Sequence, residues 1–194
     1  MLDVSSAIRA RVPSPIAHFA VAALPPILAS AGSALRSPRT LALLALASVL
    51  PDADLLLVML LPGGIAWHHG PTHSLLGSLG LGVALGLAGG LRGRALLAVG
   101  FAGVTHPLLD ALVGEPGGSA EFGVPLFWPV SSERFVSPWP LFVPYRIDEP
   151  GFLRNMVSPG AMGAYVREVA VAVAVLGVGA GVRRGWHRAA TETR

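Results

Sequence analysis

Charged residues are absent from five long, predominantly apolar stretches of the chain. These stretches are residues 12–35, 40–51, 55–91, 95–109 and 169–182. A helix that crosses the hydrocarbon core of a bilayer needs roughly 20 mostly apolar residues, and glycine and proline pairs break the long middle stretch. The pattern therefore predicts five membrane helices, over residues 16–35, 41–61, 73–91, 94–113 and 165–183.

The segment from residue 114 to residue 164 departs from this pattern. It contains eight prolines and most of the aromatic residues of the chain. A connection of this length in a small protein is usually functional or disordered, and aromatic side chains gather at membrane interfaces. We therefore expect an ordered cap loop over residues 114–164, lying at the interface.

Composition narrows the class of protein. Hydrophobic residues make up 53% of the 194 residues and charged residues only 13%, whereas a soluble domain is about 25% charged. The chain lacks the polar side chains of a soluble globule, a disordered chain or a coiled coil. It has no cysteine, which excludes disulfides, thiol catalysis and cysteine-ligated zinc. We predict an all-α integral membrane bundle that forms one domain over residues 1–194.

Every cation in the chain is an arginine, and the arginines stand in scattered groups beside the apolar stretches. Short cytoplasmic loops are enriched in arginine and lysine. An alternating five-helix path puts three groups on one side, which we assign to the cytoplasm: 36/39, 92/94 and 183/184/188. The expected protein is a multi-pass membrane protein in contact with the lipid bilayer. Scattered arginines form no basic face, so nucleic acid is not expected as a partner.

The first apolar stretch has three interpretations. Arg9 and Arg11 before it would lie outside, against the usual charge rule. The stretch can span the membrane, re-enter it around Pro25-Pro26, or belong to a signal peptide cleaved after Ala29-Ser30-Ala31. The sequence leaves these alternatives open.

Ionisable residues interrupt the predicted spans at similar depths. At about 1.5 Å per residue, Asp52 lies roughly 18 Å from Thr40 at the cytoplasmic end of its helix, and His106 lies roughly 18 Å from Arg94. Asp54, Asp110, His18 and His73 fall between about 21 and 27 Å. Buried ionisable groups in membranes are costly and usually functional. We therefore expect these groups to form one layer near the outer face.

The spacing of these residues suits a metal ion. His106 and Asp110 are four apart, as are His69 and His73, so each pair shares one helix face. Imidazole nitrogens and carboxylate oxygens bind zinc and similar cations. The alternatives for these pairs are a buried His–Asp hydrogen bond and a set of solvated histidines. In Pro51-Asp52-Ala53-Asp54 the proline breaks the helix, and the carboxylates either bind cations or cap the following half-helix.

Read together, these motifs resemble the YdjM-type family. The resemblance rests, over about residues 15–135, on His18, Pro51-Asp52-Ala53-Asp54, His69 with Thr72-His73-Ser74, His106 with Asp110, and Gly123-Val124-Pro125-Leu126-Phe127-Trp128-Pro129. It implies an inner-membrane protein with metal-dependent hydrolase activity. Gly70 stands where the family usually has a basic residue, which leaves open whether His68 or His69 is the ligand.

A more distant likeness is to the helical zinc-dependent phospholipase C fold. That likeness implies phosphoester hydrolysis, but a fold does not establish a substrate. Those enzymes carry further histidine and glutamate ligands late in the chain, and this sequence has no clear counterpart. The likeness therefore supports one or two metal ions and gives no support for a third.

The favoured hypothesis is hydrolysis of a phosphoester or ester bond in a lipid or lipid-linked substrate at the outer face, with one or two divalent cations, most simply zinc. The expected ligands are His18, Asp52, His69, His73, His106 and Asp110. Asp54 and Asp52 are the expected catalytic carboxylates, and Arg134 and Arg146 are candidates for binding an anionic substrate group. The rival hypotheses are a cation-coupled transporter and a structural or partner-binding membrane protein.

Overall fold

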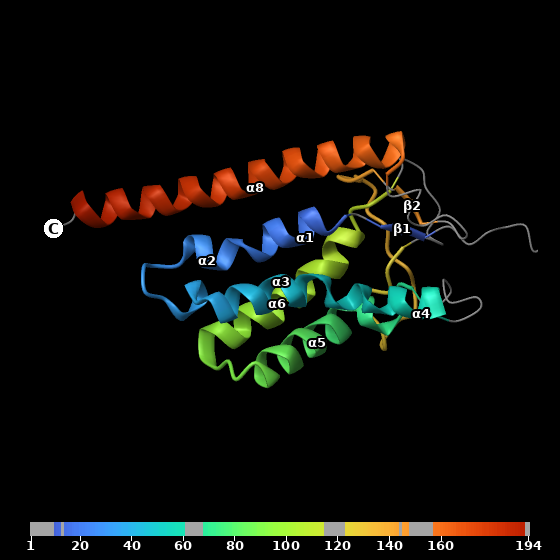
Figure 1. The fold of residues 1–194 in the computed structure, drawn as a ribbon, viewed down its shortest axis with the longest axis horizontal. Helices are drawn as coiled ribbons and strands as arrows, with labels where there is room; N and C mark the ends of the chain where they lie inside the picture. Colours follow the sequence, from blue (N-terminus) through green and yellow to red (C-terminus); the bar gives the residue numbers. More distant parts are fainter. Residues whose placement is uncertain are drawn as a thin grey trace, which may run out of the picture.

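The computed structural model describes residues 10–12, 14–60, 68–114, 123–143, 145–147 and 157–192. Within these residues the regular elements are helices and one two-stranded antiparallel ribbon (Figure 1), while residues 123–143 form turns and isolated bridges. The ribbon pairs β1 (Ala10–Val12) with β2 (Tyr145–Ile147). The helices and 3-10 turns are α1 (Pro15–Ala22), α2 (Leu24–Leu28), η1 (Ala34–Arg36), α3 (Pro38–Val49), η2 (Leu50–Asp54), α4 (Leu55–Leu60), η4 (Pro71–His73), α5 (Leu75–Ala88), α6 (Gly93–Asp110) and α8 (Pro159–Glu192).

The helices α5 and α6 form a hairpin whose backbones approach closely. A Cβ atom at Gly82 would lie 2.8 Å from the Val99 carbonyl oxygen, and one at Gly103 would collide with the Ser78 carbonyl. Only glycine permits this contact. The other side of α6 packs on α3 and α1, where Leu44, Ala47 and Val99 belong to one buried cluster. The hairpin and α3 thus form a compact unit that fixes the carboxyl end of α6.

The helix α8 differs from the others in length and exposure. It runs alongside α1 and α2 (Figure 1). Its segment Pro159–Trp186 has a mean hydropathy of 1.7, and only 17% of its apolar stretch is buried. Its outward side chains include Val166, Val173 and Val178. Among the described residues this is the one helix long and apolar enough to cross a membrane.

The five predicted spans are only partly borne out. Five apolar helical regions exist where the sequence places them, but among the described residues only α8 is both long enough and apolar enough for a span. At about 1.5 Å per residue, α3 is roughly 18 Å long and α5 roughly 21 Å, against about 30 Å of hydrocarbon. The helical fold class is confirmed, with the short β1–β2 ribbon as an addition. A multi-pass membrane bundle stays a prediction.

Several predicted boundaries are wrong, and each error has a local cause. The first helix ends at Leu28 instead of residue 35, with a break at Ala23 before Pro25 and Pro26. The second is interrupted by η2, since Pro51 lacks the N–H that an α-helix needs. The third begins at Leu75, capped by the Ser74 hydroxyl, so His73 belongs to a 3-10 turn. The fifth begins at Pro159, which shortens the predicted cap.

The described part of the cap, residues 123–143, is ordered by backbone hydrogen bonds. Leu75 N donates to Leu126 O at 3.0 Å, and Ser137 N donates to Ala111 O at 2.8 Å. These bonds fasten the cap to the first turn of α5 and to the residue after α6. Trp128 and Trp139 are exposed. The sequence predicts an ordered cap, and residues 123–143 agree with that prediction; the order of the rest of the cap and its position at an interface stay predictions.

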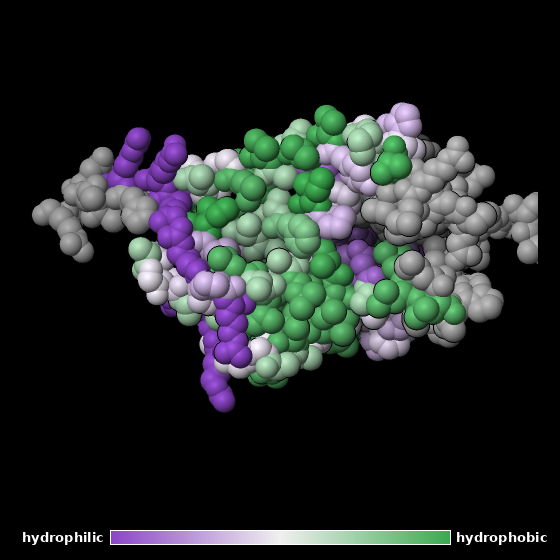
Figure 2. Space-filling view, in the orientation of Figure 1, coloured by the Kyte–Doolittle hydropathy of each residue, from purple (hydrophilic) through white to green (hydrophobic). Residues whose placement is uncertain are grey.

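The arginine groups at 36/39, 92/94 and 183/184/188 lie at one end of the molecule. The α2–α3 connection, the α5–α6 turn and the last turns of α8 all lie toward the left of Figure 1. Figure 2 shows hydrophilic side chains gathered at that end beside an apolar middle. The Arg39 guanidinium lies 3.2 Å from the position that a Cβ atom at Gly90 would occupy, which joins two of these loops. The arginines therefore share one end, as predicted.

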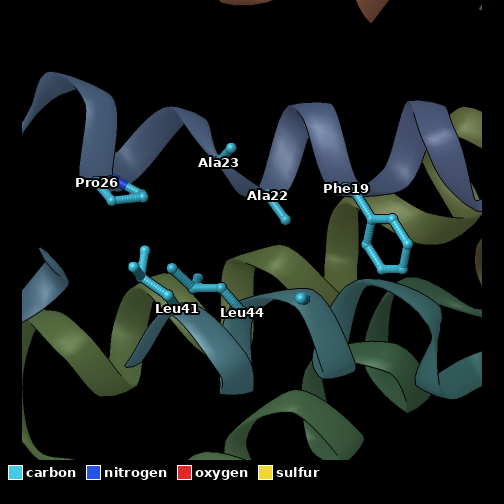
Figure 3. Close-up of a pocket in the computed structure, with 7 residues that line it drawn as sticks. Phe19, Ala22, Ala23, Pro26, Leu41 and Leu44 are labelled. Carbon is cyan, nitrogen blue, oxygen red and sulfur yellow. The ribbon is translucent and has the colours of Figure 1, made fainter. Parts of the chain in front are cut away.

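Two apolar hollows lie along the helices. The first, of about 210 Å³, opens between α1–α2 and α3, where Phe19 and Ala22 face Leu44 (Figure 3). The second, of about 380 Å³, lies between α2 and α8 and is lined by Leu24, Val178 and their apolar neighbours. Neither hollow is lined by an ionisable residue. The polar residues singled out by the sequence gather elsewhere.

Candidate metal centre

Four segments bring the predicted histidines and aspartates together at the end opposite the arginines (Figure 1). The turn η2 supplies Asp52 and Asp54, because Pro51 breaks the helix and exposes a short run of non-helical backbone. The turn that leads into η4 supplies His68, His69 and His73. The helix α1 supplies His18, and the last turns of α6 supply His106 and Asp110.

The centre of this arrangement is a tetrad formed by Asp52, His73, His106 and Asp110. His106 Nε2 lies 3.2 Å from His73 Nε2, 3.4 Å from Asp52 Oδ1 and 3.1 Å from Asp110 Oδ2. His73 Nε2 lies 3.3 Å from Asp52 Oδ1 and 3.6 Å from Asp110 Oδ2. The prediction that His106 lies near both His73 and Asp52 is therefore confirmed.

The opposite ring nitrogens of both histidines face hydrogen-bond acceptors. His106 Nδ1 lies 2.8 Å from the Ser48 carbonyl oxygen, and His73 Nδ1 lies 3.3 Å from Asp54 Oδ2. A carbonyl or carboxylate oxygen only accepts, so Nδ1 carries the proton in each neutral ring. The two Nε2 lone pairs then point at each other and at two carboxylates. Such a second shell fixes the tautomer of metal-binding histidines.

A cation satisfies the tetrad better than a proton does. Four electron-rich atoms that approach at 3.1–3.6 Å repel one another unless positive charge lies between them. A single proton joins one pair of atoms, whereas a central cation contacts all four. Ligand atoms of tetrahedral zinc lie about 3.3 Å apart when each is about 2.0–2.1 Å from the metal. The observed separations and the two-nitrogen, two-oxygen donor set fit a small divalent cation.

Asp110 extends the centre toward α1. Its Oδ2 belongs to the tetrad, while its Oδ1 lies 3.5 Å from His18 Nε2. The His18 ring stacks on His106 at a centroid distance of 4.2 Å. His18 is fully buried, and neither of its ring nitrogens has a hydrogen-bond partner among the described residues. A buried imidazole without partners is costly, so His18, His106 and Asp110 form a second group that could hold a metal.

Asp54 lies one imidazole away from the tetrad. Its Oδ1 is 2.8 Å from His68 Nδ1, and its Oδ2 accepts from the Thr72 hydroxyl at 3.2 Å. With the contact to His73 Nδ1, both of its oxygens are engaged. These contacts make Asp54 an orienting group for His73 and His68. Its predicted role as a catalytic base stays a prediction.

Both members of the His68-His69 pair are buried, and both could join a metal group with His73. His69 adopts a left-handed backbone with φ of 56°, which turns the chain between the two rings. Burial is the largest cause that lowers the pKa of His69 well below its ordinary value. Its Nε2 has no hydrogen-bond partner among the described residues, which leaves this nitrogen available for a cation. The sequence did not predict the contact between His68 and Asp54. His68 was singled out only because it stands next to His69.

The four tetrad side chains differ in exposure. The side chains of His73 and His106 are fully buried and that of Asp110 is 1% exposed, whereas that of Asp52 is 19% exposed. Within the described structure Asp52 is therefore the tetrad member most accessible to solvent. This exposure distinguishes the two carboxylates that the sequence could not rank.

The two predicted substrate-binding arginines are not shown to reach the centre. The Arg134 guanidinium donates to the Gly123 carbonyl at 3.0 Å, which closes the turn of the cap. Arg146 lies on β2 opposite Arg11, and the direction of its side chain falls outside the described structure. Arg134 thus has a structural contact, and the anion-binding role of both residues stays a prediction.

Comparison with known proteins identifies the class of protein. The model of the YdjM inner membrane protein family matches residues 14–186. The matched range includes all eight of the histidines and aspartates described above, and the chain belongs to this family. No curated protein and no solved structure matches the chain.

Proposed function

We propose that this protein is a membrane-embedded, metal-dependent hydrolase that cleaves a phosphoester or ester bond of a lipid or lipid-linked substrate. The observation that carries the proposal is the tetrad, in which four electron-rich atoms from three separate segments converge at 3.1–3.6 Å. Ionisable groups in a membrane protein are rarely buried together without a function. The family assignment supports an inner-membrane location.

The donor atoms favour zinc over magnesium or calcium. Imidazole nitrogen suits zinc, copper, iron and nickel, whereas magnesium and calcium prefer oxygen ligands. Zinc in such a site would polarise the scissile bond and lower the pKa of a water molecule. In this chain His73, His106 and Asp110 would fix the cation, and the partly exposed Asp52 would meet the substrate and its water.

The number of protein ligands argues for two cations. Four protein ligands around one zinc are typical of structural sites, whereas catalytic sites keep an open position. The His18 side of Asp110 offers that second position, because Asp110 Oδ1 and the unpaired His18 nitrogens lie there. Asp110 would therefore be shared between two cations, and His69, which lies with His68 beside His73, would be a further donor on the side of the first cation.

Position and surface support a lipid substrate. The surface of the molecule is apolar in its middle (Figure 2), and the centre lies where α1, η2, η4 and the end of α6 come together. The rival transporter hypothesis would need a polar path toward the arginine end. Along the described residues, that region is filled by the apolar cluster of Leu44, Ala47 and Val99, and the Thr40 and Ser48 hydroxyls bond within their own helix or its cap. The layout favours a pocket with one entrance.

The proposal is tested with the full chain purified in detergent. We expect two equivalents of zinc by elemental analysis, and hydrolysis of a chromogenic phosphodiester or carboxyl ester presented in lipid micelles. A chelator should abolish the hydrolysis and added Zn²⁺ should restore it. His73→Ala should remove metal and activity together, whereas the control His187→Ala should keep both. Wild-type protein that binds no divalent metal, or that hydrolyses neither probe, would refute the proposal.

A further inference from the structure

A buried carboxylate of α8 touches the helix that carries His18. Glu168 is the one acidic residue within the Pro159–Trp186 segment, and it is 1% exposed. Its Oε1 accepts from the Ser14 backbone N–H at 2.7 Å, and its Oε2 accepts from the Ser14 hydroxyl at 2.5 Å. A carboxylate is costly to bury on an apolar helix, so this contact has a specific role.

The contact fixes the first turn of α1. Ser14 is the residue before the helix, and its hydroxyl oxygen accepts from Ile16 N at 3.3 Å. Glu168 therefore holds the residue that caps α1, and His18 follows one turn later. Among the residues proposed to bind metal, His18 alone lies on α1; the others lie on η2, the His68–His73 turn and α6.

We infer that Glu168 is a positioning residue that holds His18 in place for the second cation, so that the docking of α8 controls occupancy of that position. The inference rests on the proposed function for the second cation. A group that orients a metal ligand typically changes metal affinity by about 10–100-fold when it is removed. All four tetrad residues lie on η2, η4 and α6, so none of the ligands of the first cation is held by Ser14, and that cation should keep its affinity.

The test is a titration of full-length protein in detergent with Zn²⁺ alone. We expect Glu168→Leu to lower the affinity for the second of two zinc ions by about 10–100-fold, while the affinity for the first stays unchanged. Glu168→Gln keeps the length and can still accept the Ser14 N–H, so it should retain both ions. His18→Ala should reproduce the Glu168→Leu result, and the double variant should be no worse than either single variant, because both act on one position.

Further measurements separate this inference from the proposed function. Hydrogen exchange of metal-free protein should show faster exchange over residues 15–22 in Glu168→Leu, with α3 and α6 unchanged. If Glu168→Leu does not fold, Ser14→Ala removes the hydroxyl half of the contact, leaves the backbone N–H bond in place, and should weaken binding of the second ion. Wild-type protein without zinc refutes the hydrolase proposal, and the exchange result then decides the positioning role. Unchanged second-ion affinity, or unchanged exchange over α1, in folded Glu168→Leu or Ser14→Ala would overturn the inference.

Discussion

The two ends of the molecule both carry charged residues, but these residues are exposed at one end and largely buried at the other. At one end Arg36, Arg39, Arg92 and Arg94 are exposed and belong to separate loops. At the other end the histidines and aspartates are buried apart from the half-buried Asp52, and neighbouring donor atoms from four segments lie 3.1–3.6 Å apart. Exposed charges keep their hydration, whereas buried charges must find partners.

This difference shows which charges the fold depends on. The arginine groups can vary without leaving a buried group unsatisfied, since water replaces each lost contact. Removing one member of the tetrad leaves the other members buried without compensation, a cost of several kcal/mol in typical proteins. The comparison therefore predicts large effects at the metal centre and small effects at the arginine end.

The largest effect is expected from the double variant His106→Ala with Asp110→Ala. It removes two tetrad members and the carboxylate shared with His18, so we expect loss of all bound zinc and of hydrolysis. If these residues only formed a hydrogen-bonded pair, removing both together would be nearly neutral for every measurement. Elemental analysis and activity of the membrane-inserted variant decide between the two. Full metal content and activity would refute the assignment.

A smaller effect is expected from Asp54→Asn. The amide keeps the size of the side chain but weakens its acceptance from His73, His68 and Thr72. Zinc affinity should fall by about 10–100-fold, as for other groups that orient metal-binding histidines. The matched control is Glu133→Gln, an exposed residue of the cap. Equal zinc affinity of the two variants would show that Asp54 does not orient the site.

The close packing of α5 against α6, which lie between the two ends, is tested by Gly103→Ala. Its Cβ atom would collide with the Ser78 carbonyl, so the α5–α6 contact must open, at a cost of about 1–3 kcal/mol. The control Gly80→Ala lies on α5 with nothing within 4 Å of its Cβ position, and alanine should stabilise that helix by about 1 kcal/mol. Thermal unfolding followed by circular dichroism measures both. Similar shifts in both variants would contradict the close approach.

The smallest effect is expected from Arg92→Gln and Arg94→Gln. Both side chains are exposed in or beside the α5–α6 turn, and surface substitutions of this kind usually change stability by no more than about 0.5 kcal/mol. Zinc content and melting temperature should match those of wild type. A loss of bound zinc in either variant would show that the two ends are coupled and that the comparison is wrong.

The sequence identified the chemistry of the site because the chemistry is carried by residue type. Aspartates and histidines are rare in an apolar chain, and their similar distances from the arginine ends of the helices put His106 and Asp52 at one level. The i,i+4 spacing of His106 and Asp110 predicts their contact, which the structure shows at 3.1 Å. The spacing of His69 and His73 led to a helix start at residue 73, which is wrong. Pro71 favours a 3-10 turn and Ser74 caps the helix, so α5 begins at Leu75.

Residue pattern alone thus determined the helical class, the family and the members of the polar layer, since these depend on hydrophobicity, spacing and residue chemistry. Tertiary structure decided which atoms face each other. It made Asp110 the carboxylate shared with His18, set Asp54 behind His73, and joined Glu168 of α8 to Ser14 across 154 positions of the chain. Such contacts depend on how separate helices pack, and no local pattern in a sequence records the distance between residues that are far apart along it.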